Sequence, residues 1–158
     1  MKYRPGAILF LSAIILFLNS CKDEYTLCST SKTVSFIGGF YQKISGSDVS
    51  ARVPNLNIYL LNTGSSAIYS NQQNAHTFSL PLNPQADSSR YVISISAAQS
   101  DTLTIVYSTQ SISLSPECGS VFNNNITKVY TTAHSLDSAV LINAVINTNP
   151  LENAKIFF

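Results

Sequence analysis

The chain has 158 residues, of which 45% are hydrophobic and only 11% are charged, and its formal net charge is +1. Without Lys2 and Arg4, seven basic and eight acidic residues remain, which gives the rest of the chain a net charge of −1. This balance excludes the basic footprint of a nucleic-acid-binding protein, so no nucleic-acid partner is expected. Since charges are scarce, Ser, Thr, Asn and Gln must make the surface polar, as in many secreted β proteins.

The first twenty residues have the pattern of a secretory signal. Lys2 and Arg4 precede an apolar run, residues 7–18 (AILFLSAIILFL), which is too short to span a bilayer, where about 20 residues are needed. The run ends in Ser20, a small residue directly before Cys21, and this arrangement resembles a bacterial lipobox. The resemblance implies that the signal is cut before Cys21 and that the cysteine thiol is diacylglycerylated. An ordinary signal peptide with a chance cysteine, or an uncleaved amphiphilic helix, is the alternative.

The lipids on Cys21 would tether the protein without making it span the membrane. Each buried acyl CH2 contributes about 0.8 kcal/mol, so two or three chains hold durably where one holds weakly. The next residues, Lys22, Asp23 and Glu24, resemble the export signal of Bacteroidota surface lipoproteins, which directs them to the outer face of the outer membrane. The alternative is a solvated linker that keeps the globular part off the headgroups.

Two cysteines remain once Cys21 carries lipid. In an oxidising compartment the simplest fate of Cys28 and Cys118 is a disulfide, with two buried free thiols as the alternative. Closing a loop of about 90 residues should stabilise the fold by roughly 4 to 5 kcal/mol in the chain-entropy model. The role would be stability, because neither His76 nor His134 is placed by sequence to activate a thiol.

The 138 residues left after cleavage suit a single domain. We therefore divide the chain into a lipoprotein signal peptide (residues 1–20), a lipidated N-terminus and linker (21–32) and one domain (33–158).

In the first half of this domain the hydrophobic period is two, which predicts strands. Gly38 and Gly39 indicate a bulge or bend inside the first of them. The segments in chain order are a strand at 33–41, a loop at 43–54, a strand at 56–62, a short strand at 67–70, a polar connection at 71–75, and a strand at 76–82 that Pro81 places at an edge.

The clearest element is a hairpin. Residues 90–98 (RYVISISAA) and 102–108 (TLTIVYS) flank a short polar turn, and apolar residues alternate with Ser and Thr along both segments. We expect one face of this hairpin to be buried and the other to be wet.

The remaining segments are less regular. A weak strand at 110–115, a turn at 116–119, an Asn-rich loop at 123–125, a strand at 126–132, an ambiguous segment at 135–147 and an apolar strand at 154–158 follow in order. The segment 135–147 has one helical face, but its Val and Ile content favours a strand. Residues 154–158 are too apolar to be left unpaired.

About eight short strands with polar turns and no βαβ alternation predict an all-β fold, an antiparallel β-sandwich, with an immunoglobulin-like topology as one option.

The body resembles an uncharacterised family of small Bacteroidota lipoproteins, a domain of unknown function. Its motifs here are Cys28 together with residues 76–84 (HTFSLPLNP), 101–108 (DTLTIVYS), 115–119 (SPECG) and 154–158 (AKIFF). The resemblance implies the anchor, the disulfide and the β fold, and it supplies no catalytic residue.

The sequence contains no motif of a nucleophile elbow, zinc protease, phosphate loop or dinucleotide site. His76 and His134 lie too far apart to predict a metal site, and Asp87, Asp101 and Asp137 each sit beside Ser or Thr, where Asp usually forms turns. We expect no enzyme activity, no cofactor and no metal.

Two of these acidic sites resemble the Asp-Ser/Thr-aliphatic site of Bacteroidota O-glycosylation. Asp101 precedes Thr102, and Asp137 precedes Ser138, so Thr102 and Ser138 are candidate glycan acceptors. The alternative is a turn aspartate followed by a strand.

Three classes of function follow from this reading. The favoured one is a surface-exposed outer-membrane lipoprotein that acts as a non-catalytic binding or accessory module of an envelope complex, with the membrane and an outer-membrane protein as partners. A structural or adhesion component is the second, and a degradative enzyme is the third.

Overall fold

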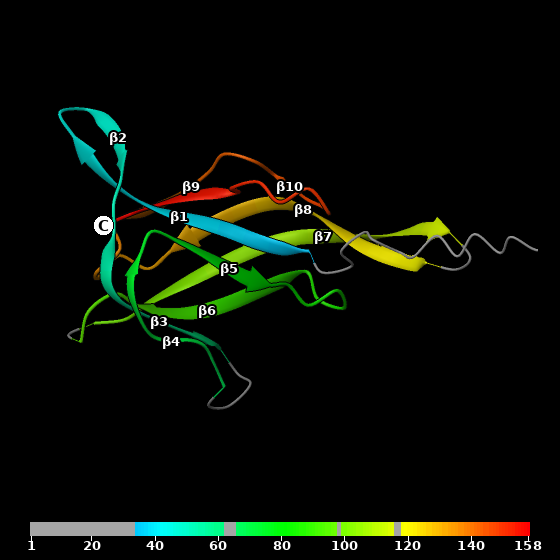
Figure 1. Cartoon of the computed structure of the whole chain (residues 1–158), viewed down its shortest axis with the longest axis horizontal. Helices are drawn as coiled ribbons and strands as arrows, with labels where there is room; N and C mark the ends of the chain where they lie inside the picture. The colour runs from blue at the N-terminus through cyan, green and yellow to red at the C-terminus, as the bar shows by residue number, and fades with distance from the viewer. Residues whose placement is uncertain (1–33, 62–65, 98, 116–117) are drawn as a thin grey trace, which may run out of the picture.

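The structure is a computed structural model that describes residues 34–61, 66–97, 99–115 and 118–158. Every regular element in these ranges is a β-strand, and the strands form two sheets that pack face to face (Figure 1). The prediction of an all-β sandwich is confirmed. The immunoglobulin-like topology stays a prediction.

The first sheet is built around β1 (Ser35–Ile44). Its strand order is β2-β1-β11-β9, with β2 at Ser47–Ser50, β11 at Ala154–Phe157 and β9 at Ser138–Leu141. The first half of β1 pairs with β5 (Thr77–Pro81), and its second half pairs with β2. The last strand, β11, pairs in parallel with β1 and antiparallel with β9, so the predicted pairing of residues 154–158 into a sheet is confirmed.

The second sheet has the strand order β10-β8-β7-β6-β3-β4 and is antiparallel throughout. Its strands are β3 (Val53–Leu60), β4 (Ala67–Ala75), β6 (Ser88–Ser94), β7 (Asp101–Ser115), β8 (Gly119–Thr131) and β10 (Val145–Ile146). The pairing of β6 with β7 confirms the predicted hairpin.

The core lies between the sheets and is formed by alternate residues of each strand. From the hairpin, Tyr91, Leu103 and Ile105 are fully buried. They meet aromatic and aliphatic side chains of the first sheet, among them Phe36, Phe40, Phe78, Leu80 and Ile156. The rings of Phe40 and Phe78 lie 5.1 Å apart, within the range in which aromatic rings attract one another.

The two central glycines of β1 do not form the predicted bulge. The pairing of β1 with its neighbours runs without a register shift. A Cβ atom at Gly38 would overlap the ring of Phe78, and one at Gly39 would overlap the carboxylate of Glu152. The glycines are therefore needed because side chains from β5 and from the loop before β11 lie directly on the backbone of β1.

Several polar segments that the sequence suggested as loops are strands. Residues 43–54 contain the end of β1, a tight turn at Ser45 and Gly46, and β2. Both turn residues have positive φ, 52° and 85°, which is the geometry of a type I′ hairpin turn. Residues 71–75 belong to β4, and the Asn-rich segment 123–125 lies inside β8.

One long strand replaces two predicted ones, because β7 runs through residues 108–110 without a break. Its pairing with β8 has a register shift after Val106, where Thr127 is the extra residue. The ambiguous segment 135–147 contains two short strands, β9 and β10, and no helix.

Beyond Asn124, where the pairing of β10 with β8 ends, β7 and β8 continue as a two-stranded arm formed by residues 110–115 and 119–123. The arm extends from one end of the sandwich, opposite the hairpin of β1 and β2 (Figure 1). Within the described ranges, no helix is long and apolar enough to cross a membrane.

Candidate interaction surface

The predicted anchor and export residues, Cys21, Lys22, Asp23 and Glu24, and one cysteine of the predicted disulfide, Cys28, lie outside the part of the chain that the structure describes. Lipidation, surface export and the disulfide therefore stay predictions. Cys118 is described and lies at the tip of the arm, directly before β8, where its backbone N–H donates to the Ser115 hydroxyl at 3.0 Å.

The two candidate glycan acceptors lie in different settings. Ser138 and the preceding Asp137 are exposed, and Ser138 begins β9 at the border of a sheet. Thr102 is half-buried inside the second sheet, between β6 and β8, and the preceding Asp101 is 1% exposed. Only at the Ser138 site are the acceptor and the preceding aspartate both exposed to solvent.

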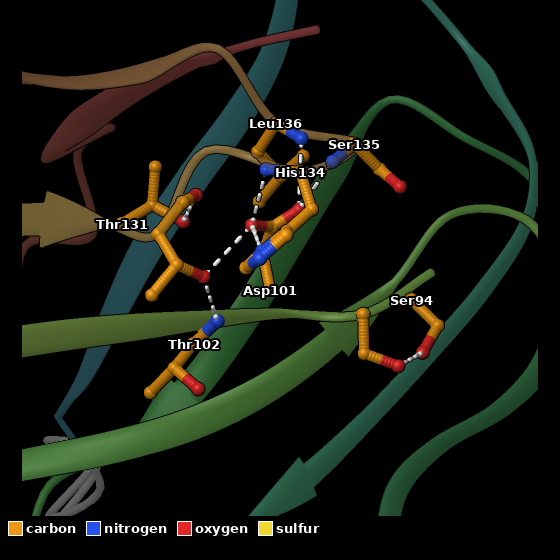
Figure 2. Close-up of polar contacts among 9 residues, drawn as sticks. Ser94, Asp101, Thr102, Thr131, His134, Ser135 and Leu136 are labelled. Atoms are coloured by element: carbon orange, nitrogen blue, oxygen red, sulfur yellow. Dashed lines mark hydrogen bonds and ion pairs between the residues drawn. The ribbon is translucent and has the colours of Figure 1, made fainter. Parts of the chain in front are cut away.

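Asp101 joins the start of β7 to the loop that follows β8 (Figure 2). Its Oδ1 accepts hydrogen bonds from the Thr132 hydroxyl at 2.8 Å and from the His134 backbone N–H at 2.9 Å. Its Oδ2 accepts from the backbone N–H groups of Ser135 at 2.7 Å and Leu136 at 2.9 Å. The carboxylate therefore fixes a loop more than thirty residues further along the chain.

The electrostatics of Asp101 agree with a structural role. Burial raises the pKa of this carboxyl, but the hydrogen bonds from Ser135, Thr132, Leu136 and His134 outweigh burial and hold the pKa below its usual value. The Nδ1 atom of His134 lies 3.1 Å from Oδ1, and its imidazole is 56% exposed. Both carboxylate oxygens of Asp101 accept hydrogen bonds from the loop. The carboxylate therefore fixes the loop, and neither oxygen is left to orient a substrate.

Metal-ligating side chains do not gather in the described residues: these contain no group of three or more His, Cys, Asp or Glu that could hold an ion. His76 lines a separate open cavity of about 440 Å³ with Arg52, Tyr69 and residues of β4.

Exposed apolar side chains occur instead on the strands and loops at one side of the sandwich. There β9 is the last strand of the first sheet, and β10 is the last strand of the second (Figure 1). Four aliphatic residues of this segment and of the loop before β11 are 46 to 58% exposed: Val140, Ile142, Val145 and Leu151. We refer to these four side chains and strands β9 and β10 as the β9–β10 edge.

The β9–β10 edge is held in place by Asn153, which is 1% exposed. Its Oδ1 accepts from the Ile37 backbone N–H at 2.9 Å, and its Nδ2 donates to the carbonyls of Asn143 at 3.0 Å and Val145 at 3.2 Å. Its backbone N–H donates to Ile37, and its carbonyl accepts from Ile142 and Asn143. One side chain thus ties β1 of the first sheet to β10 of the second.

A charged and aromatic cluster lies beside the edge on the outer face of the first sheet. The Tyr41 hydroxyl donates to Glu152 at 3.0 Å, and the Lys155 ammonium lies 2.9 Å from Asp48 and 4.9 Å from the centre of the Tyr41 ring. Burial and the hydrogen bond to Glu152 raise the pKa of Tyr41, and the bond to Asp48 raises the pKa of Lys155. Because Lys155 pairs with Val140 across β11 and β9, this cluster borders the edge directly.

The cluster continues to the end of β11. The ring of Phe157 lies 6.1 Å from that of Tyr41, and the Lys43 ammonium lies 5.5 Å from its centre. Lys43 and Phe157, with Asp137 and Ser138, line an open cavity of about 370 Å³ at the start of β9. The outer face next to the edge therefore offers aromatic, cationic and anionic groups within a short distance.

Residues 55–158 match a family of unknown function, DUF6452. The chain belongs to the DUF6452 family. No curated protein and no solved structure matches the chain. The DUF6452 region contains the β9–β10 edge, Asn153, the Asp101 loop and the arm, whereas β1 and the predicted anchor precede it.

Sequence reasoning missed the edge and Asn153 for a physical reason. Val140 and Ile142 alternate with other apolar residues, which is the signature of a buried strand face. Only the pairing of strands shows that β9 ends its sheet. Asn153 precedes an apolar strand and carries no signal that distinguishes it from a loop residue.

Proposed function

We propose that this DUF6452 chain is an outer-membrane lipoprotein, anchored through Cys21 and displayed at the cell surface through Lys22, Asp23 and Glu24, which acts as a non-catalytic accessory module of an envelope complex. The observation that carries the proposal is the β9–β10 edge, where the end strands of both sheets lie on one side of the sandwich and four aliphatic side chains are exposed. Exposed aliphatic side chains beside an unpaired strand edge favour contact with another protein.

The partner that suits this edge is an extended, mostly apolar segment of an outer-membrane protein. Within the described ranges no strand pairs with the outer side of β9, so its backbone can add a further strand. Natural proteins block such edges with Lys, Pro, bulges or very short strands. Strand β9 is short, with four residues, but it reads Ser-Ala-Val-Leu and its pairing with β11 is regular.

The neighbouring cluster would form the polar rim of the contact. Stable interfaces combine an apolar centre with a polar border, and they bury about 1,200 to 2,000 Å² in total. Four aliphatic side chains alone are too few for that area. A partner strand along β9 would lie two strand spacings, about 10 Å, from β11, so its long side chains can meet Lys155.

The predicted disulfide belongs to the same proposal. Cys118 is not a free thiol in the structure. A bond to Cys28 would hold the chain that follows the lipid anchor against the arm of the domain.

The test is purification of the tagged lipoprotein from detergent-solubilised outer membranes of its native cells. We expect a stoichiometric integral membrane protein to copurify with the unchanged chain and to be lost from the double variant Val140→Lys/Ile142→Lys, because two charges on the edge oppose its burial. Val49→Lys is the matched control, since Val49 is a similarly exposed aliphatic residue on β2, at another border of the first sheet.

Three results are informative. Loss of the partner from the double variant alone supports docking at the edge. Retention of the partner by that variant contradicts the edge as docking surface. Absence of any stoichiometric partner from the unchanged chain contradicts the accessory role and favours the structural or adhesion component.

A further inference from the structure

The arm of β7 and β8 has an unusual surface for a part of a soluble sandwich. Ile112, Leu114 and Phe122 are 38 to 44% exposed there. From Ser108 to Asn125 the only ionisable side chain besides Cys118 is Glu117. The arm is therefore uncharged along both of its strands and carries large apolar groups beyond the core.

Both faces of the arm are apolar in part. Ile112 pairs with Val121 and Ser111 pairs with Phe122, so Ile112 and Phe122 point to opposite faces. Val121, on the face of Ile112, is 3% exposed, and Leu114 is the extra residue at a register shift near the tip. A hairpin that packs on a core is apolar on one face and polar on the other. On the arm, large apolar side chains are exposed on both faces, which suits a hairpin that meets an apolar or interfacial medium.

The arm also lies at the end of the molecule where the predicted anchor enters. Ser35 at the start of β1 pairs with Pro81, and two residues further the Asn83 carbonyl accepts a hydrogen bond from the Tyr107 hydroxyl at 2.9 Å. Tyr107 precedes the arm by three residues. Figure 1 shows β1 beginning at the end from which the arm extends.

The chain lengths permit the anchor and the arm tip to reach one plane. The six residues of β7 in the arm, 110–115, make it about 20 Å long. Cys21 precedes Val34, the first described residue, by thirteen positions, which span at most about 45 Å when extended. The connection is long enough to run the whole length of the arm.

From these observations we propose that the arm rests against the lipid bilayer and inserts Ile112, Leu114 and Phe122 into its headgroup region. The inference rests on the proposed lipid anchor, which would hold the arm at high effective concentration beside the membrane. The arm then adds apolar burial to the acyl chains and fixes the direction in which the sandwich stands.

The orientation has a consequence for the opposite end. The hairpin of β1 and β2, with the exposed Ile44, lies at the far end of the long axis and would point away from the bilayer (Figure 1). The β9–β10 edge runs along the side of the sandwich, so it would face a neighbour in the plane of the membrane.

Because the chain contains no tryptophan, a single introduced tryptophan is the only source of tryptophan fluorescence. The acylated mature protein, carrying Leu114→Trp or Phe122→Trp, is reconstituted into phosphatidylcholine vesicles with and without dibrominated phosphatidylcholine, which quenches tryptophan by contact. The matched control is Ile44→Trp, an exposed aliphatic position on the opposite hairpin. Flotation of the vesicles measures attachment separately.

We expect all three variants to float with the vesicles, a blue-shifted emission at positions 114 and 122, and quenching several-fold stronger there than at position 44. Flotation with equal or no quenching at the arm positions overturns the inference and leaves the anchor intact, and it would point to a protein or a second copy as occupant of the arm. Failure of the acylated protein to float overturns the anchor and the inference with it.

Discussion

At the scale of single residues, two buried polar side chains hold together parts of the chain that are distant in sequence. Asp101 was expected to form a turn with its own backbone, as an aspartate between two strands usually does. In the structure it accepts hydrogen bonds from the loop at Thr132 to Leu136 instead. No local pattern could indicate this, because three of the four donors are backbone N–H groups, which any residue supplies.

We predict that Asp101→Asn lowers the free energy of unfolding by about 2 to 3 kcal/mol, because an amide cannot accept from four donors and its own N–H groups would face them. Chemical denaturation of the unchanged and variant proteins measures the difference. The control is Asp137→Asn, an exposed neighbour on the same loop, which should change stability by no more than about 0.5 kcal/mol. Equal stability of the two variants would show that the hydrogen bonds to Asp101 are dispensable.

The pH dependence follows from the same contacts. The folded-state pKa of Asp101 is depressed below the unfolded value, so ionisation of Asp101 stabilises the fold above the unfolded pKa, near 3.8. That stabilisation is lost as the pH falls through the folded pKa. We expect the free energy of unfolding to decrease below about pH 4 in the unchanged protein and to decrease less in Asp101→Asn. Parallel slopes in the two proteins would refute this assignment.

Asn153 has a comparable role between the sheets. We predict that Asn153→Ala lowers stability by about 2 to 4 kcal/mol, because it removes three side-chain hydrogen bonds and leaves the Ile37 N–H without its acceptor. Asn149→Ala is the control, since Asn149 is exposed. Hydrogen exchange should show early opening at β10 in the first variant alone, and unchanged protection of β10 would contradict the role of Asn153.

At the scale of elements, alternation of apolar and polar residues was enough to predict the hairpin of β6 and β7, because one face of each strand is buried between the sheets. The same rule failed where a strand leaves the core. Residues 71–74 are polar because solvent covers them. Asn124 is 4% exposed, and its amide oxygen accepts a hydrogen bond from the Thr109 hydroxyl on the neighbouring strand. Register and strand order also decide that Val140 borders solvent, and neither is encoded by the local period.

The two glycan acceptors can be separated at this scale. If the chain is O-glycosylated in its native cells, we expect the glycan on Ser138, at the exposed start of β9, and not on the half-buried Thr102. Ser138→Ala should then reduce the intact mass to that of polypeptide plus lipid, whereas Thr102→Ala should leave the glycan mass in place. A mass of polypeptide plus lipid for the unchanged protein would remove the proposal.

At the scale of the whole molecule, the arm, the β9–β10 edge and the distal hairpin lie on three different parts of one sandwich (Figure 1). The proposed anchor gives these parts distinct surroundings: the bilayer for the arm, a neighbouring protein for the edge, and the exterior for the hairpin. The sandwich class could be predicted from composition and period. The separation of these surfaces could not, because it depends on which strands end each sheet.

The most direct test of the account is whether Cys21 carries lipid. Cells fed labelled palmitate should produce a labelled protein that fractionates with the outer membrane, and Cys21→Ser should lose both the label and the membrane association. A Cys21→Ser protein that remains in the envelope fraction, or an unchanged protein that never acquires label, would contradict the account.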